Sequence, residues 1–183
     1  MTEIDHVVLL DEEGRAIGTA PKSSVHGTET ALHLAFSCHV VNSAGQVLVT
    51  RRALGKKTWP GVWSNSFCGH PRPAEPVPAA VHRHAGHELG ITLRDVRLAL
   101  PLFRYRAVDA SGMVEYEICP VFVAVTDDEP EPNPLEVAEA RWVEADDLAA
   151  SIRTTPWAFS PWLVLQAEQL HLFDAPSRQR RAS

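Results

Sequence analysis

The chain has 183 residues, 45% of them hydrophobic, and its 17 Lys and Arg against 23 Asp and Glu give a net charge of −6. At about 150 residues per domain, this length predicts a single domain over residues 1–183. No apolar run approaches the roughly 18 residues of a membrane span, and the acidic start lacks the basic region of a signal peptide, so we expect a cytoplasmic protein without membrane contact. An acidic chain is also a poor candidate for general binding of nucleic acid.

Alternating apolar residues in the first two thirds of the chain predict β-strands. Three pairs of such runs flank short polar turns that contain glycine, which is the pattern of a β-hairpin. The expected pairs are residues 7–10 with 16–19, 34–41 with 46–52, and 98–108 with 113–125. Residues 138–143 predict a further strand.

Three helices are expected, over residues 79–89, over residues 145–153, and from Pro161 to about residue 173. Gly90 is a good stop signal for the first helix, and Ser160 is a good N-cap for the last. Trp157 and Phe159, just before the last helix, are expected to pack in the core. Hairpins with helices inserted among them indicate an α/β (α+β) fold in which a mixed sheet is sandwiched by helices.

A glycine loop precedes the first expected helix, and acidic residues lie in the loop and in the last turn of the helix. The residues that define this pattern are Gly69, Glu75, Arg83 and Glu88. A carboxylate at this place can bind a divalent cation that bridges phosphate oxygens, because hard cations prefer oxygen ligands. The spacing resembles the Nudix box, which implies a Nudix fold with its core at about residues 31–165 and an N-terminal extension.

Two positions of this segment depart from the pattern of Nudix hydrolases. His84 and His87 stand where the resemblance implies glutamates that hold the magnesium ions for hydrolysis. The segment therefore favours the fold more than the hydrolytic activity. A Nudix pyrophosphohydrolase acting on a nucleoside diphosphate derivative stays as the alternative function, and a non-catalytic scaffold that binds metal and ligand is a third.

Two glutamates lie two positions apart in an expected strand. The side chains of Glu115 and Glu117 therefore project to the same face, which continues with apolar residues and is expected to be buried. Two carboxylates on a buried face are costly unless they are paired or bound to metal. Pro120 implies a sheet edge or a bulge nearby.

Other candidate residues have weaker signals of their own. An isolated cysteine such as Cys68 is more often a small buried hydrophobe, although its place beside the glycine loop favours a chemical role. Residues 51–57 hold four positive charges, which suits phosphate groups but is also typical of a solvated hairpin end. His26 and His33 form a histidine pair that by itself says little.

Taken together, these segments resemble type 1 isopentenyl diphosphate isomerase, over residues from about 5 to 167. The segments that carry the resemblance are residues 32–37, 50–54, 59–66, 68–71, 103–107, 115–121 and 160–162. The resemblance implies an enzyme that interconverts isopentenyl and dimethylallyl diphosphate through a tertiary carbocation, in isoprenoid biosynthesis. The partner it implies is a small diphosphate substrate, and the chain is expected to be a monomer or a homodimer.

The resemblance also implies two metal sites. The first would hold Mn²⁺, Zn²⁺ or Mg²⁺, and its implied ligands are His26, His33, His70, Glu115 and Glu117. The second would hold Mg²⁺ between Glu88, the backbone carbonyl of Cys68 and the oxygens of the diphosphate.

The remaining implied roles concern substrate binding and proton transfer. The residues matched to diphosphate binding are Lys22, Arg52, Lys56 and Arg83. Cys68 and Glu117 match the two groups that exchange protons with the substrate, and Tyr105 matches a residue that hydrogen-bonds to Glu117. Trp162 matches an indole that offers its π face to the cationic intermediate.

Overall fold

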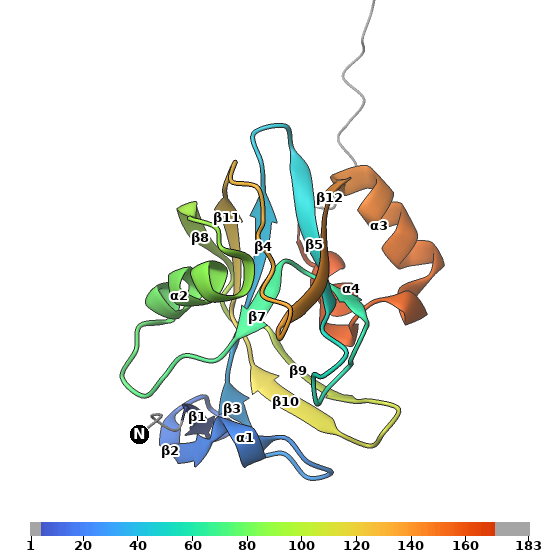
Figure 1. Cartoon of the computed structure of the whole chain (residues 1–183). Helices are drawn as coiled ribbons and strands as arrows, with labels where there is room; N and C mark the ends of the chain where they lie inside the picture. Colours follow the sequence, from blue (N-terminus) through green and yellow to red (C-terminus); the bar gives the residue numbers. More distant parts are fainter. Residues whose placement is uncertain (1–4, 171–183) are drawn as a thin grey trace, which may run out of the picture.

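The computed structural model describes residues 5–170, which form two β-sheets and a small number of helices (Figure 1). The five-stranded sheet has the order β2-β1-β3-β10-β9 within these residues. Its strands are β1 His6–Leu10, β2 Ala16–Pro21, β3 His33–Leu34, β9 Arg104–Val108 and β10 Val114–Ile118. The other sheet has the path β12-β5-β4-β11-β8, with β6 paired to β5 and β7 to β4. Its strands are β4 Phe36–Val41, β5 Gln46–Arg52, β6 Trp63–Ser64, β7 Phe67–Gly69, β8 Arg94–Leu100, β11 Val121–Val125 and β12 Val137–Glu144.

Helices cover both faces of the larger sheet, as the sequence predicts (Figure 1). They are α1 Lys22–Val25, α2 Val77–Leu89, α3 Ala145–Thr154, the 3₁₀ turn η1 Pro156–Ala158, and α4 Pro161–Ala167. Helix α2 buries Val81 and Leu89 in one hydrophobic core. Helices α3 and α4 bury Ile152 and Leu163 in a second core on the other face. Within residues 5–170, no helix has both the length and the apolar character that crossing a membrane requires.

The predicted helix boundaries are mostly confirmed. Helix α2 ends at Gly90, whose φ of 66° places it in the left-handed conformation that glycine adopts at low cost. Ser160 caps α4 by accepting a hydrogen bond from the backbone of Leu163. Helix α4 ends at Ala167, so the predicted end near residue 173 is wrong; residue 173 itself lies outside the described residues. The core prediction for Trp157 is also wrong, since this side chain is 83% exposed.

Three strands that were predicted to be continuous are each divided between the two sheets. The segment predicted over residues 34–41 breaks at Ala35, between β3 and β4. The strands of the long hairpin break at residues 101–103 and at 119–120, so β9 and β10 belong to one sheet while β8 and β11 belong to the other. Pro120 lies at the last of these breaks, where proline is tolerated because no ladder N–H is needed.

The breaks lie side by side, because backbone hydrogen bonds join them. The Ala35 amide donates to the Ile118 carbonyl, and the Cys119 amide donates to the Phe103 carbonyl. The two sheets therefore separate along one line that crosses three neighbouring strands. Strand β7, which the sequence did not predict, pairs with β4 beside this line and brings Cys68 opposite Ser37.

Strand β7 approaches helix α2 closely at a glycine. A Cβ atom built on Gly69 would lie 2.5 Å from Cε1 and Nε2 of His84, far inside van der Waals contact. His84 is buried, packs edge-on against Phe36 and hydrogen-bonds to Glu88, so its ring has little freedom to move. Glycine at position 69 is therefore a packing requirement of the fold.

We predict opposite effects for two glycine-to-alanine substitutions in this region. Gly69→Ala should lower the free energy of unfolding by about 1–3 kcal/mol, because the new methyl group overlaps the His84 ring. Gly86→Ala, in α2 with open space around its Cα, should raise it by about 0.5–1 kcal/mol. Urea denaturation of both variants measures these changes, and equal stability of the two would contradict the packing argument.

Candidate active site

The strand register brings three predicted site residues into one row. Glu117 of β10 pairs with His33 of the parallel strand β3 on one side. On the other side Glu117 pairs with Tyr105 of the antiparallel strand β9. Residues opposite one another in a sheet project to the same face. All three side chains are buried, which confirms the expected burial of this face.

Three histidines surround the Glu117 carboxylate. Its Oε1 atom lies 3.2 Å from Nε2 of His70, 3.4 Å from Nε2 of His33 and 3.9 Å from Nε2 of His26. One ligand atom from each of these four residues lies within 4.8 Å of the others. All four residues, which come from three separate parts of the chain, are among the metal ligands that the resemblance implies.

The chemistry of this cluster fits a bound cation. The Nδ1 atom of His33 lies 2.8 Å from the carbonyl oxygen of Ala31, which fixes the proton on Nδ1 in the neutral ring. The bare Nε2 of His33 then faces a carboxylate oxygen, and it has no hydrogen-bond partner. Nε2 of His26 is buried without a partner too. A divalent cation between these atoms would satisfy them all, and imidazole with carboxylate suits Mn²⁺, Zn²⁺ or Mg²⁺.

Electrostatics of the cluster keep Glu117 ionised. Burial acts to raise the pKa of Glu117, but its contacts with His26, His33 and His70 hold the pKa well below its usual range. Burial lowers the pKa of His70 to about 4, whereas the neighbouring Glu117 outweighs burial and raises the pKa of His33.

Glu115 lies outside the group of four, although the resemblance implies it as a ligand. Its two oxygens accept hydrogen bonds from Thr58 Oγ1 at 2.5 Å and from Tyr105 Oη at 2.5 Å. Tyr105 Oη also lies 2.9 Å from Glu117, so one phenol joins the two carboxylates. Burial and the charge of Glu117 raise the pKa of Glu115, and burial with both carboxylates raises the pKa of Tyr105 well above its usual value.

Cys68 is held as a thiol between two polar side chains. Its Sγ atom lies 3.2 Å from Ser37 Oγ and 3.3 Å from Asn65 Oδ1. Burial raises the pKa of Cys68 to about 12, although both hydrogen bonds act in the opposite direction. A thiol in this state carries a proton that it can give to a partner in the cavity. Cys38 and Cys119 are fully buried, as expected for core cysteines.

The Trp162 indole forms part of the same buried region. Its Nε1 donates toward Ser64 Oγ at 3.0 Å and Asn65 Oδ1 at 2.9 Å. The guanidinium carbon of Arg52 lies 5.2 Å from the centre of the Trp162 ring, which is the geometry of a cation–π contact. Trp59 packs edge-on against the same ring. Its backbone φ is positive, at 43°, which is unusual for a residue with a large side chain.

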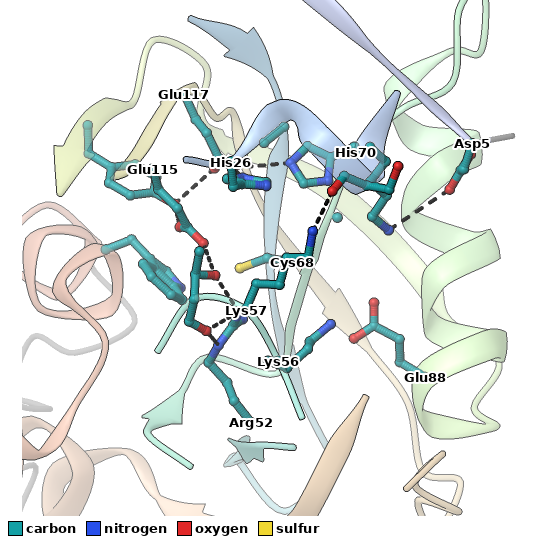
Figure 2. Close-up of a pocket in the computed structure, with 17 residues that line it drawn as sticks. Asp5, His26, Arg52, Lys56, Lys57, Cys68, His70, Glu88, Glu115 and Glu117 are labelled. Carbon is teal, nitrogen blue, oxygen red and sulfur yellow. Dashed lines mark hydrogen bonds and ion pairs between the residues drawn. The ribbon is translucent and has the colours of Figure 1, made fainter. Parts of the chain in front are cut away.

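A cavity of about 480 Å³ joins these groups (Figure 2). Eleven of the thirteen predicted site residues line it: Lys22, His26, Arg52, Lys56, Cys68, His70, Glu88, Tyr105, Glu115, Glu117 and Trp162. His33 pairs with Glu117 in the sheet and has no exposed surface. In the view of Figure 2, the Cys68 sulfur lies between the end with Glu115 and Glu117 and the end with Arg52 and Lys56.

The cations of the cavity already have partners. Arg52 donates through Nε and Nη2 to the carbonyl oxygen of Thr58 and through Nη2 to its hydroxyl. The ammonium of Lys56 is bound by Glu136, and Lys22 lies 3.9 Å from Asp5. Each cation is thus held toward the cavity before any anion binds.

Arg83 does not line the cavity. Its guanidinium donates to both oxygens of Glu75 and, at 3.1 Å, to the backbone carbonyl of His70. These bonds join α2 to the loop that follows β7, so the structure gives Arg83 a place in shaping the site instead of direct contact with a substrate. Glu88 does line the cavity, and His84 Nδ1 holds one of its oxygens at 2.7 Å.

Several residues around the site were missed by the sequence analysis. They are Ser37, Asn65 and Glu136. Their types are common in loops and strands, so only their contacts single them out. Lys57, one of the four positive charges of residues 51–57, lines the cavity and donates to the backbone carbonyl of Ser23. The Tyr116 side chain lies on the opposite strand face from the two glutamates, and its hydroxyl donates to Glu12.

Comparison with known proteins agrees with this fold and site. A model of the NUDIX domain matches residues 31–163. A protein of known structure from Deinococcus radiodurans superposes with a TM-score of 0.70 at 20% identity, covering 91% of this chain and 99% of that one. A MutT NUDIX hydrolase from Burkholderia pseudomallei has a TM-score of 0.58 at 26% identity and covers 75% and 97%. The fold and the box before α2 thus define a NUDIX-domain protein.

Comparison with curated relatives identifies the family within the class of NUDIX-domain proteins. The isopentenyl-diphosphate Delta-isomerase of Agromyces mediolanus is 68% identical over 90% of this chain and 80% of its own length. The proteins of the same name from Clavibacter sepedonicus and Kocuria rhizophila are 61% and 57% identical, covering 90% and 93% of this chain and 87% and 95% of their own lengths. The chain belongs to the isopentenyl-diphosphate Delta-isomerase family.

We predict that the histidine cluster makes the protein's stability depend on divalent metal. Excess Mn²⁺ or Zn²⁺ should stabilise the fold, by about 2.7 kcal/mol at a concentration 100 times the Kd. His26→Ala should reduce this gain, because it removes one imidazole at the partly exposed side of the cluster. Thermal unfolding with and without metal measures the gain. His82→Ala, at an exposed histidine of α2, is the control, and equal gains in both variants would contradict the prediction.

A second prediction concerns the pH dependence of stability that arises from a buried histidine of β4. His39 is fully buried with Nε2 2.8 Å from Gln166 Oε1, and burial lowers its pKa to about 4. The unfolded chain binds a proton on His39 below about pH 6.5, whereas the folded chain does not. The free energy of unfolding should therefore fall as pH drops below this value, by up to about 1.4 kcal/mol per pH unit from His39.

His39→Gln removes this contribution while keeping a side chain that can pair with Gln166. Urea denaturation between about pH 5 and pH 7 should show a shallower pH dependence for the variant than for the unsubstituted protein. Parallel dependences of the two proteins would show that His39 is not held neutral by the fold.

Proposed function

We propose that the protein interconverts isopentenyl diphosphate and dimethylallyl diphosphate by moving a carbon–carbon double bond by one position. The observation that carries the proposal is the shared cavity, in which a buried carboxylate lies at one end, cations lie at the other, and a half-buried thiol lies between them, with an indole next to Arg52. This combination suits a short hydrocarbon with a diphosphate head. The names of the curated relatives support the same activity.

The diphosphate would bind at the cationic end of the cavity. Arg52 offers a planar fork for phosphate oxygens, and Lys22 and Lys56 act as point charges. A Mg²⁺ ion held by Glu88 and the Cys68 carbonyl would neutralise part of the charge of the diphosphate. The cations that line the cavity, together with a bound Mg²⁺, would set the local sign of charge, so the net −6 charge of the chain does not oppose an acidic substrate here.

The proton transfers would take place at the other end. An unactivated alkene must gain a proton at one carbon and lose one at another, which requires two groups of opposite role. Cys68 is held as a thiol and Glu117 as a carboxylate, so the free site already contains one donor and one acceptor. Tyr105 donates a hydrogen bond to Glu117 at 2.9 Å and fixes its orientation. Positioned proton transfer contributes roughly 10²–10⁴-fold in rate.

The intermediate between the two transfers would be a tertiary carbocation. The π face of Trp162 can stabilise a positive charge by about 2 kcal/mol or more in a site without water. Trp162 is 1% exposed and Trp59 packs against it, so this part of the cavity keeps water away from the cation. Exclusion of water matters because water would trap the cation as an alcohol.

A metal ion in the cluster of His26, His33, His70 and Glu117 would hold the carboxylate in place and withdraw part of its charge. Mg²⁺, Mn²⁺ and Zn²⁺ all suit these ligands. A cytoplasmic, single-domain enzyme that acts as a monomer or homodimer, without nucleic acid or membrane partners, fits the composition and the low cysteine content.

The alternative, hydrolysis of a nucleoside diphosphate derivative, has less support. Hydrolysis would need carboxylates at the two positions of α2 that hold His84 and His87. His84 is buried against Gly69 and bonds to Glu88, whereas His87 is exposed. Neither side chain adds an oxygen ligand to the one that Glu88 provides.

The activity is tested with isopentenyl diphosphate and Mg²⁺ in D₂O, followed by NMR. We expect a shift of the double bond and incorporation of deuterium. Cys68→Ala and Glu117→Gln should each lower turnover by at least about 10²-fold, because each removes one proton-transfer group. Both variants should still bind inorganic pyrophosphate. Tyr116→Phe, next to Glu117 but on the opposite strand face, is the control and should retain activity.

Three results would count against the proposal. Absence of both the double-bond shift and deuterium in the unsubstituted protein would exclude the isomerase. Release of phosphate or of a nucleotide from a panel of nucleoside diphosphate derivatives would favour hydrolysis. Full turnover in Cys68→Ala or Glu117→Gln would show that the assigned role of that residue is wrong.

A further inference from the structure

Asn65 lies beneath the cavity, in the short connection between β6 and β7. Its side chain is 1% exposed, so each polar atom must find a partner within the protein. No part of the reaction proposed above uses this residue. Its contacts nevertheless reach two of the groups that the reaction depends on, Cys68 and Trp162.

The orientation of the Asn65 amide is fixed by its own nitrogen. Nδ2 donates to the backbone carbonyl of Cys38 at 3.0 Å and to that of Phe67 at 2.8 Å. Both partners can only accept, so a reversed amide would place oxygen against oxygen. The backbone of Asn65 is held as well, because Thr50 Oγ1 donates to its carbonyl at 2.9 Å. Oδ1 therefore points away from the two carbonyls and toward the cavity side.

Three donors meet at Oδ1. Trp162 Nε1 and Ser64 Oγ each lie 2.9 Å from it, and Cys68 Sγ lies 3.3 Å from it. Indole N–H is a donor only, so its direction is certain. The thiol has a second contact, with Ser37 Oγ, and Trp162 has a second contact, with Ser64. Among the residues from 5 to 170, Asn65 is the one whose side chain hydrogen-bonds to both.

We infer that Asn65 is a positioning residue, whose single amide oxygen sets the Cys68 thiol and the Trp162 indole relative to each other. This inference rests on the proposed function, in which one group exchanges the proton and the other faces the resulting cation. These two side chains come from β7 and α4, which are far apart in the sequence. A misplacement of about 1 Å between groups of this kind costs about 10²-fold in rate.

The inference is tested by removing the oxygen and, separately, the nitrogen that fixes its direction. Asn65→Ala should lower kcat by about 10²-fold and leave KM nearly unchanged, because Arg52 and Lys56 are not disturbed. Asn65→Asp keeps an oxygen on the Trp162 side but places its second oxygen against the carbonyls of Cys38 and Phe67, so the side chain loses its fixed orientation and kcat should fall here too. Rates are expressed per folded site, counted from the stoichiometry of binding of inorganic pyrophosphate with Mg²⁺. If Asn65→Ala does not fold, Asn65→Ser carries the same expectation, since its hydroxyl is too short to reach both partners.

An NMR measurement tests the contact without relying on activity. The Nε1–H resonance of Trp162 is identified by its loss in Trp162→Phe. It should shift in Asn65→Ala, while the resonance of the exposed Trp157 stays in place. This measurement tests the position of the indole independently of catalytic activity. If the unsubstituted protein did not isomerise the substrate, the proposed function alone would fail.

Asn42→Ala is the matched control. It removes an asparagine amide from the turn between β4 and β5, at the end of β4 away from Cys68. The control should keep the kcat per folded site and the Trp162 resonance of the unsubstituted protein. The inference would be overturned by an unchanged Trp162 resonance in Asn65→Ala, by an unchanged kcat per folded site, or by an equal loss of kcat in Asn42→Ala.

Discussion

Two negative charges buried side by side on strand β10 constrain the rest of the site. Burying a carboxylate without compensation has a large free-energy cost, and the repulsion between Glu115 and Glu117 increases that cost for each of them. Glu117 is compensated by three imidazoles that reach it from β3, the segment after α1, and the loop after β7. Glu115 is compensated by the hydroxyls of Thr58 and Tyr105. The partners of these two carboxylates come from segments between residues 26 and 105, so burying the two charges requires these segments to meet at β10.

The division of the strands gives these charges their place. Where the two sheets separate, a space opens beside Tyr105 of β9, which still packs in one hydrophobic core of the larger sheet. The space becomes a cavity between the row of His33, Glu117 and Tyr105 and the loop that carries Cys68. The backbone hydrogen bonds across the break hold neighbouring strands together beside the cavity.

The sequence predicts those parts of the structure that depend on local chemistry. Glycine after α2, serine before α4 and the alternating glutamates of β10 each have a local physical reason, and each is confirmed. The division of three strands is only partly visible locally, because Pro101 and Pro120 mark two of the breaks whereas Ala35 fits a strand as well as its end. Strand β7 is too short to show a period, and Asn65 is an ordinary loop residue until its partners from β4 and α4 are known. Most of the candidate ligands were found through their resemblance to a family, since histidines this far apart in the chain have no spacing signal.

Arg52 connects the two ends of the cavity in the proposed reaction. Its guanidinium lies over the Trp162 ring, on which the resemblance places the stabilisation of a carbocation. A second positive charge near the same indole is unfavourable while the guanidinium remains uncompensated. In the proposed reaction, a diphosphate bound to Arg52 would offset this repulsion, because it would add negative charge beside the guanidinium. The head group of the substrate would then do more than anchor the molecule, since its charge would help the hydrocarbon end of the cavity to accept a cation.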